Sequence, residues 1–509
     1  MNTLRHRAIA ASAGTGKTFR LAHRYLGLLS SGVAPDRICA LTFSRKAAGE
    51  IFDKIVDRLC LGAASAARRA ETARVITAEG LTAPPDDPRA YVGLLRHLLD
   101  QQHRLHIGTL DSFIVGIVRA FPLELGLPPD LQPMDDEGGE AGSRRQAILA
   151  RLFDPTRWTG QEDDRQGGGF LDDFRLACFG RENKALARVL EETLSNHFGF
   201  YHTHAGPEWH WGDADCIWPG AARWWDLAAE GPADAATTGP TTPSPEAVEA
   251  ATAALQEALT KAFGGGRGDA VAAQCAALYQ ICLTHAPDRP WPRLDSVIAR
   301  QLVAAAAKPE APVVTFYRKS HAIPADVWAR LRQGLARLIA IEIDRALSST
   351  RGLRAVLERY DRLYSDAASQ DGCYTFDDLA RLLGPAGRTP GRNPHDAERL
   401  YIDYRLDARL DHWLLDEFQD TSDTQWAALA NLVDEAVQGD ERSFFYVGDV
   451  KQSIYGWRGG NHRLFRQVLD EYRDLGDRGI LLESMTDCHR SLPAVIEAVN
   501  AVFDDLPSW

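Results

Sequence analysis

Two segments that lie far apart in the sequence carry residue types that can bind and cleave a nucleoside triphosphate. The second segment places the acidic pair Asp416-Glu417 at the end of an apolar run. The first segment reads Ala11-Ser12-Ala13-Gly14-Thr15-Gly16-Lys17-Thr18. Backbone N–H groups and a lysine ammonium bind phosphate oxygens, whereas one carboxylate can bind Mg²⁺ and its neighbour can activate water. Together the segments predict a nucleoside triphosphatase site.

The first segment has the features of a phosphate-binding loop. Gly14 and Gly16 let the backbone turn sharply and approach phosphate oxygens. Lys17 is then expected to reach the β- and γ-phosphates, and the Thr18 hydroxyl to bind Mg²⁺. A purely structural turn is the alternative, and it is disfavoured because a predicted strand precedes the loop and a predicted helix follows it. Residues Ala11 to Thr18 are therefore predicted to hold the nucleotide.

The acidic pair is predicted to lie at the carboxyl edge of a sheet, where α/β proteins bind ligands. Asp416 is the predicted Mg²⁺ ligand, and Glu417 is the predicted base that orients and deprotonates the attacking water. A solvated acidic turn is the alternative. The strand residues Trp413 to Leu415 before the pair and the capped helix after it disfavour that alternative.

A third segment, from Phe445 to Gly459, combines a strand, a polar turn and aromatic residues beside cations. The amide of Gln452 could sense the γ-phosphate. Trp457 and Arg458 could stack on and pair with a nucleic acid strand. Taken alone, an aromatic residue in such a turn is more often part of the core than a base-stacking platform.

The elements that must position these residues alternate between strand and helix. Residues 1–125 contain an apolar strand at Arg7–Ala11, a helix at Gly16–Leu29 and a second strand at Ile38–Phe43, after which Ser44 can cap another helix. Such alternation predicts an α/β fold with a parallel sheet that is covered by helices on both faces.

Residues 126–365 form a large helix-rich insertion, which is Ala-rich and interrupted by Gly167-Gly168-Gly169 and by a Thr/Pro stretch at Thr237–Pro245. The α/β pattern resumes over 366–486, where a capping box at Ser422 opens a helix. Strands are predicted there at His412–Leu415, Ser443–Val447 and Gly479–Leu482. Residues 487–509 are expected to begin a second motor domain that is truncated at Trp509.

Composition limits the classes of function. The formal charge of −13 argues against nucleic acid binding through overall basicity, so a DNA contact must be local. We find no apolar run long enough to span a membrane, and a cytoplasmic protein is expected. The eight cysteines are scattered, which favours free thiols in a reducing compartment.

Ordered motifs give the chain a family resemblance. It resembles the UvrD/Rep-like superfamily 1 helicases, and most closely their RecB/AddA branch. The motifs are AASAGTGKTF at 10–19, LTFSRKAAGEI at 41–51, IGTLDSF at 107–113, LLDEFQDTSDTQW at 414–426, VGDVKQSIYGWRGG at 447–460 and HRSLPAVIEAVN at 489–500. The resemblance implies a P-loop NTPase (RecA-like) sheet with an inserted helical domain.

The resemblance also implies roles for single residues, with ATP and Mg²⁺ as cofactors. Gln452 would couple the γ-phosphate to the DNA-contacting segment, and Arg490 would reach the γ-phosphate from the seam between two motor domains. Phe43 and Trp457 would stack on bases of single-stranded DNA. The other implied DNA-binding residues are Thr42, Thr109, Ser112, Tyr455 and Arg458.

The implied function is an ATP-dependent 3′-to-5′ DNA helicase or translocase that serves recombination and double-strand-break repair. It would act on single-stranded and duplex DNA as the motor of a helicase–nuclease with a partner subunit. Because the chain stops inside the second motor domain, hydrolysis and unwinding are expected to be impaired. The alternative is a catalytically incomplete regulatory fragment that binds ATP and DNA.

One cluster in the insertion has metal-ligand residue types. It contains His202, His204, His210 and Cys216 among several tryptophans. A zinc site is possible, but the spacing matches no standard pattern, and aromatic packing is favoured. A contact of these aromatic residues with duplex DNA or with another protein of the assembly stays open.

Overall fold

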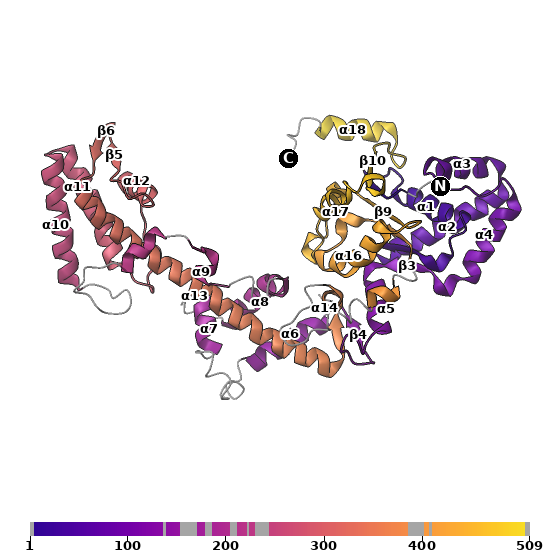
Figure 1. Cartoon of the computed structure of the whole chain (residues 1–509), viewed down its shortest axis with the longest axis horizontal. Coiled ribbons are helices and arrows are strands. Elements are labelled where there is room, and N and C mark those ends of the chain that lie inside the picture. The colour runs from indigo at the N-terminus through magenta and orange to yellow at the C-terminus, as the bar shows by residue number, and fades with distance from the viewer. Residues whose placement is uncertain are drawn as a thin grey trace. The chain divides into compact units, whose positions relative to one another are not determined.

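The computed structural model describes residues 5–135, 139–152, 170–178, 186–203, 211–220, 223–229, 244–384, 402–406 and 410–503. Contacts divide the chain into two compact units (Figure 1). The first unit combines Met1–Gln146 with Ser365–Trp509, and the second is Ala147–Tyr364. The identity of these units as motor and accessory domains stays a prediction.

A six-stranded parallel sheet forms the centre of the first unit, in the order β10-β1-β9-β8-β2-β3. The predicted α/β class with a parallel sheet is confirmed. The strands are β1 Arg7–Ala11, β2 Ile38–Thr42, β3 His106–Thr109, β8 His412–Leu415, β9 Ser443–Gly448 and β10 Leu481–Met485. Strand β10 begins and ends later than the predicted Gly479–Leu482, because its pairing with β1 sets its bounds: Arg7 pairs with Leu481 and Ala11 with Met485.

The central strands are apolar on both faces, as a parallel sheet between two helical layers requires. Every residue of β2, β8 and β9 is buried. Successive side chains alternate between two hydrophobic clusters, so Trp413 and Leu415 face one layer while Leu414 faces the other. The sheet is therefore held from both sides.

Helices of two groups cover the sheet (Figure 1). One face packs against α1 Lys17–Ser30, α2 Arg45–Ala64, α3 Ala66–Ala78 and α4 Pro88–Asp100. The other face packs against α16 Asp423–Gln438 and α17 Leu464–Tyr472, with the start of α5 Leu110–Ala120. The predicted caps are confirmed: the Ser44 side chain accepts the backbone N–H of Ala47, and Ser422 with Gln425 forms the capping box of α16.

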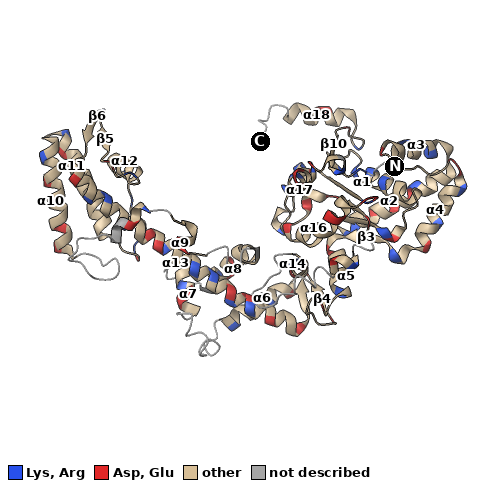
Figure 2. Cartoon of the chain, viewed as in Figure 1, with Lys and Arg blue, Asp and Glu red and all other residues tan. Residues whose placement is uncertain are grey.

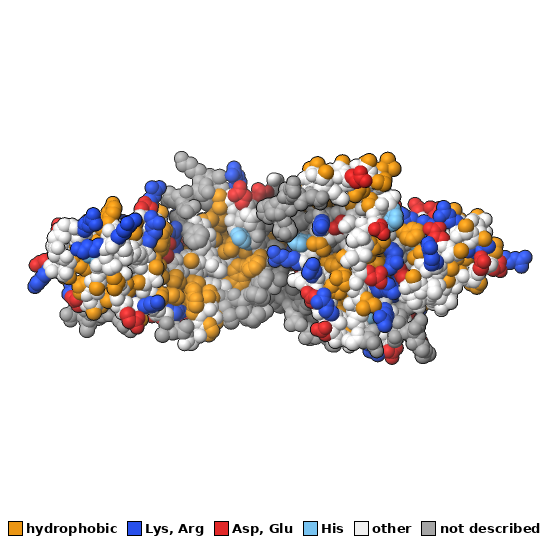
Figure 3. Space-filling view, turned by 90° about the horizontal axis from the view of Figure 1, so that it is seen from above, with side chains coloured by type: hydrophobic (Ala, Val, Ile, Leu, Met, Phe, Trp, Pro, Cys, Tyr) orange, Lys and Arg blue, Asp and Glu red, His pale blue; other side chains and the backbone are white. Residues whose placement is uncertain are grey.

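Smaller elements complete the first unit. Strand β4 Gln132–Met134 pairs in parallel with β7 Cys373–Thr375, and α14 Phe376–Leu383 packs beside α5. Helix α6 is Gly139–Leu152, and α18 is Pro493–Phe503. Apolar side chains of α18, such as Val495 and Phe503, are exposed. Figure 3 shows hydrophobic side chains at the surface over this helix.

The second unit is helix-rich. Its core joins α10–α12 and a β5–β6 hairpin to the first half of α13. Figure 2 shows both signs of charge along α13, which fits the absence of overall basicity. The elements are α7 Phe170–Ala177, α8 Leu186–Thr203, α9 Ala214–Ile217, α10 Pro245–Phe263, α11 Arg267–Thr284, α12 Val297–Ala305, β5 Val313–Phe316, β6 Lys319–Ala322 and α13 Ala325–Asp371.

The predicted His/Trp/Cys cluster is described only in part. His204 and His210 lie outside the described residues, as do Gly167–Gly169 and residues 237–243 of the Thr/Pro stretch. His202 pairs with Asp361 at 3.2 Å between the ring Nε2 and a carboxylate oxygen. All eight cysteines are free thiols. No described helix is long and apolar enough to cross a membrane, and the cytoplasmic location stays a prediction.

Candidate nucleotide site

The residues singled out in the sequence share one edge of the sheet. All six strands run in the same direction, so their carboxyl ends lie together. The phosphate loop follows β1, Phe43 follows β2, Asp416 follows β8, and the Gln452 segment follows β9. This edge is where α/β proteins bind ligands.

The loop after β1 turns through two glycines in left-handed conformations, with φ of 75° at Gly14 and 93° at Gly16. Any side chain would strain these positions. Thr15 Oγ1 donates a hydrogen bond of 2.8 Å to the carbonyl of Ser12, which closes the turn. Helix α1 begins directly afterwards at Lys17, so its free N–H groups and positive dipole end face the loop.

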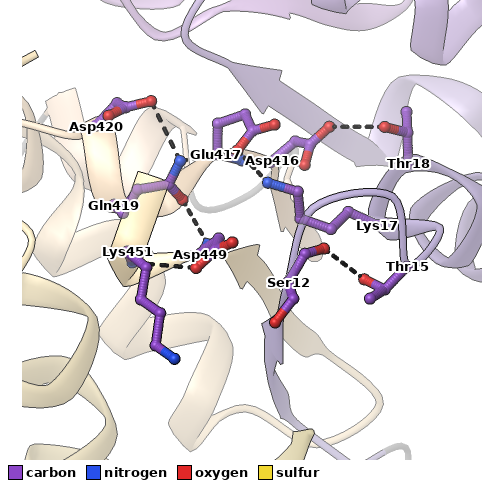
Figure 4. A network of polar contacts seen from close by, with 10 residues as sticks. All are labelled: Ser12, Thr15, Lys17, Thr18, Asp416, Glu417, Gln419, Asp420, Asp449 and Lys451. Atoms are coloured by element: carbon purple, nitrogen blue, oxygen red, sulfur yellow. Dashed lines mark hydrogen bonds and ion pairs between the residues drawn. The ribbon is translucent and has the colours of Figure 1, made fainter. Parts of the chain in front are cut away.

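The phosphate loop and the acidic pair meet directly (Figure 4). Lys17 Nζ donates to Glu417 Oε2 at 2.6 Å. Thr18 Oγ1 donates to Asp416 Oδ2 at 3.4 Å. Two segments 400 residues apart thus form one polar cluster at the carboxyl edge of the sheet.

Glu417 has an unusual backbone. Its φ is 51°, in the left-handed region that non-glycine residues rarely adopt. The Glu417 N–H donates to Asp416 Oδ1 at 3.0 Å, which holds the turn. The side chain is 31% exposed, so water can reach it. Within the described residues Oε2 accepts every hydrogen bond that the Glu417 side chain receives, and Oε1 accepts none.

Asp416 is buried, and its environment disfavours the charged form. Burial, and after it the charge of Glu417, raises the pKa of Asp416 to about 6, and the Lys17 ammonium opposes both effects. A carboxylate and a hydroxyl are the hard oxygen ligands that Mg²⁺ prefers. The described residues contain no cluster of three or more His, Cys, Asp or Glu side chains suited to a metal. Asp416 and Thr18 therefore fit a cation that takes its other ligands from phosphate and water.

The raised pKa predicts a pH-dependent cation affinity. A group whose pKa is higher in the folded state than its ordinary 3.8 stabilises the fold fully below 3.8, and that contribution is lost as pH rises through about 6. Cation binding has the opposite dependence, because it requires the ionised carboxylate. We expect Mn²⁺ affinity, measured by calorimetry from pH 5 to 8, to fall as pH drops below about 6. Asp416→Asn should remove this dependence, and a flat profile in the unaltered chain would contradict the assignment.

The segment after β10 crosses the phosphate loop. Ser12 N donates to the carbonyl of Met485 at 3.4 Å, and His489 N donates to the carbonyl of Gly14 at 2.9 Å. A Cβ added at Gly14 would lie 2.8 Å from Arg490 Cβ and 3.0 Å from Cys488 Sγ. The backbone of Arg490 thus lies beside the loop, and its predicted contact with the γ-phosphate stays a prediction.

Aromatic residues from two segments lie in a row. The ring centroids of Phe43 and Tyr455 are 4.5 Å apart, and those of Tyr455 and Trp457 are 6.2 Å apart. The Arg458 guanidinium lies 5.3 Å from the Trp457 ring centroid. Trp457 is 63% exposed, so this aromatic row, defined as Phe43, Tyr455 and Trp457, is not closed off by the core.

The three hydroxyl residues predicted near DNA differ in accessibility. Thr42 and Thr109 are buried, and Ser112 is exposed. Thr109 Oγ1 lies 2.7 Å from Ser112 Oγ and accepts the Ser112 N–H, so Thr109 caps α5. A DNA contact by the Thr42 or Thr109 hydroxyl would require the surrounding segments to move.

Sequence reasoning missed Gln419. The side chain of the predicted sensor Gln452 makes no hydrogen bond within the described residues, whereas the buried Gln419 side chain makes three. Its partners are Glu417, Asp420 and the Asp449 backbone. A polar side chain two positions after the acidic pair, in a turn between buried elements, was the available signal.

A phosphate loop after β1 and an acidic pair after β8, joined on a parallel sheet, define a P-loop NTPase. The model of the UvrD/REP helicase N-terminal domain family matches residues 2–195 and 335–473, which is more than half of the chain. The chain belongs to this family.

Curated relatives agree with the family, and all three described here carry the name of an ATP-dependent helicase/nuclease component. The relative from Pelotomaculum thermopropionicum is 26% identical over 98% of this chain and 37% of the relative. The proteins of the same name from Streptococcus sanguinis and Moorella thermoacetica are 24% and 27% identical over 98% and 97% of this chain. The chain spans 38% and 33% of those two relatives. The predicted resemblance to the RecB/AddA branch of UvrD/Rep-like helicases is confirmed.

Proposed function

We propose that this chain carries the ATP-binding motor of a DNA helicase that translocates 3′ to 5′. The observation that carries the proposal is the direct contact of Lys17 with Glu417 at 2.6 Å, supported by that of Thr18 with Asp416. These contacts join the two halves of a triphosphatase site on a fold of the helicase family. The relatives' name supports work in recombination and double-strand-break repair as the motor part of a helicase–nuclease with a partner subunit.

In this proposal the residues Ala11–Thr18 hold ATP, and Thr18 and Asp416 hold Mg²⁺, which would neutralise charge on the triphosphate. Glu417 accepts the proton of the water that attacks the γ-phosphate. The bond from the γ-phosphorus to the oxygen that bridges it to the β-phosphate breaks, and ADP leaves with that oxygen. Gln452 and Arg490 act on the γ-phosphate.

Single-stranded DNA is proposed to lie on the aromatic row, where bases can stack regardless of sequence. Arg458, beside Trp457, supplies a cation for the backbone. Thr42, Thr109 and Ser112 are the further proposed contacts. Duplex DNA is proposed to be the substrate that the complete assembly opens.

The proposal is tested by two binding measurements and one rate. A fluorescent ATP analogue and a labelled oligothymidylate should both bind this chain, and the oligonucleotide should stimulate ATP hydrolysis. A chain that bound neither ligand would overturn the proposal. A chain that bound both ligands without hydrolysing ATP would favour a regulatory role.

Trp457→Ala is expected to weaken binding of single-stranded DNA by about 1–3 kcal/mol, because one stacked base would lose its platform. Fluorescence anisotropy with labelled oligothymidylate measures this loss. Trp291 is a suitable control position because it is also an exposed tryptophan, at 47% exposure, and belongs to the second unit. Trp291→Ala should leave the affinity within about twofold, and an unaltered affinity in Trp457→Ala would remove this residue from the DNA path.

A further inference from the structure

The segment Gly448–Gly460, which leaves β9 and carries Tyr455 and Trp457, packs directly on the turn that follows Glu417. A Cβ at Gly448 would lie 2.6 Å from Gln419 Oε1, and a Cβ at Gly460 would lie 3.1 Å from the Asp420 carbonyl. Both ends of the segment therefore approach the turn too closely for any side chain. Hydrogen bonds add to this contact: Asn461 N donates to the Thr421 carbonyl at 2.9 Å.

Gln419 lies at the centre of this contact, and its side chain is buried. Its Oε1 accepts the backbone N–H of Asp449 at 2.9 Å, and its backbone carbonyl accepts Ser453 Oγ at 3.3 Å. Its Nε2 donates to Glu417 Oε2 at 2.8 Å and to Asp420 Oδ2 at 3.2 Å. One side chain thus joins the segment after β9 to Glu417.

The chemistry of the partners fixes which way the amide points. The backbone N–H of Asp449 can only donate, so the amide oxygen must face it. The amide nitrogen then faces two carboxylates, which accept. A glutamate here would place a third carboxylate against two others, and an apolar side chain would leave a buried N–H unpaired. Only an amide satisfies both sides.

The contacts form one continuous chain across the site (Figure 4). It runs from Lys17 Nζ through Glu417 Oε2 and the Gln419 amide to the Asp449 N–H. Because the amide is planar and rigid, a displacement of Asp449 that moves its oxygen also moves the nitrogen that anchors Glu417. Phosphate that engages Lys17 acts on the same chain from the other end.

We infer that Gln419 is a positioning residue that couples occupancy of the aromatic row to the orientation of Glu417. The inference rests on the proposed function, because it assigns DNA to the row and ATP to the loop. Coupling between two ligands is reciprocal, so a nucleotide bound at Lys17 should change the affinity for single-stranded DNA by the same factor as the reverse. That factor is measurable without hydrolysis.

The experiment measures the affinity of labelled oligothymidylate with and without Mg²⁺ and the non-hydrolysable analogue AMP-PNP. In the unaltered chain the two affinities should differ by about fivefold or more. Gln419→Met keeps the length of the side chain and removes its hydrogen bonds, and the ratio should fall below about twofold. Gln438→Met is the matched control, since Gln438 is a hydrogen-bonded glutamine on the exposed face of α16, and it should keep the ratio of the unaltered chain.

A ratio in Gln419→Met equal to that of the unaltered chain would overturn the inference. So would an unaltered chain that binds both ligands at a ratio near one, although the proposed function would survive. An unaltered chain that binds neither ligand defeats the proposed function and the inference with it. If thermal melting shows that Gln419→Met is unfolded, Gln419→Glu decides by the same criterion, because it keeps the oxygen for Asp449 and loses the donor for Glu417.

Discussion

Glu417→Gln is expected to slow ATP hydrolysis by about 10²- to 10⁴-fold while the nucleotide still binds. The amide cannot accept the proton of the attacking water. It does keep an oxygen that can accept from Lys17, which now bonds Glu417 Oε2. A steady-state phosphate-release assay at saturating ATP and oligothymidylate measures the rate, and a fluorescent nucleotide measures the affinity.

Glu441→Gln is the matched control for this prediction. Glu441 is an exposed turn residue with a φ of 63°, so it shares the left-handed backbone of Glu417 but not its partners. Its substitution should leave the hydrolysis rate within about twofold. Normal hydrolysis by Glu417→Gln would exclude Glu417 as the base.

The elements next to the motifs could be predicted from the sequence because local chemistry determines them. The predicted strands at Arg7–Ala11 and His412–Leu415 have the observed bounds, and the helix predicted from Gly16 begins at Lys17. Continuous apolar runs allow no other placement than a buried strand, and serine caps mark helix starts. A parallel sheet then brings the carboxyl ends together, so the meeting of Lys17 with Glu417 followed from class and order alone.

The finer geometry depends on contacts between segments that no local pattern contains. The left-handed backbone of Glu417 and the amide chain through Gln419 exist because the segment after β9 lies against the turn after β8. Burial of Thr42 likewise follows from its place in the sheet, although its motif indicates a DNA contact. The role of a polar residue thus depends on the partner that the fold brings to it.

The network also explains why loss of the loop lysine should have a broad effect. Lys17→Ala is expected to lower the hydrolysis rate by about 10²- to 10³-fold, because it removes a positioned cation from the developing charge of the phosphates. It should also weaken nucleotide binding by about 10- to 100-fold, as expected when a charged hydrogen bond is lost. Unlike Glu417→Gln, this substitution thus affects both binding and rate.

A third consequence of Lys17→Ala distinguishes a site lysine from a merely structural one. The Lys17 ammonium now lowers the pKa of the buried Asp416, which otherwise would lie above its value of about 6. Without the ammonium, the pH below which Mn²⁺ affinity falls should move upward. Lys308→Ala, at an exposed lysine of the second unit, should change neither the hydrolysis rate nor this pH. A Lys17→Ala chain that kept the pH profile of the unaltered chain would show that Lys17 and Asp416 do not share one charged site in solution.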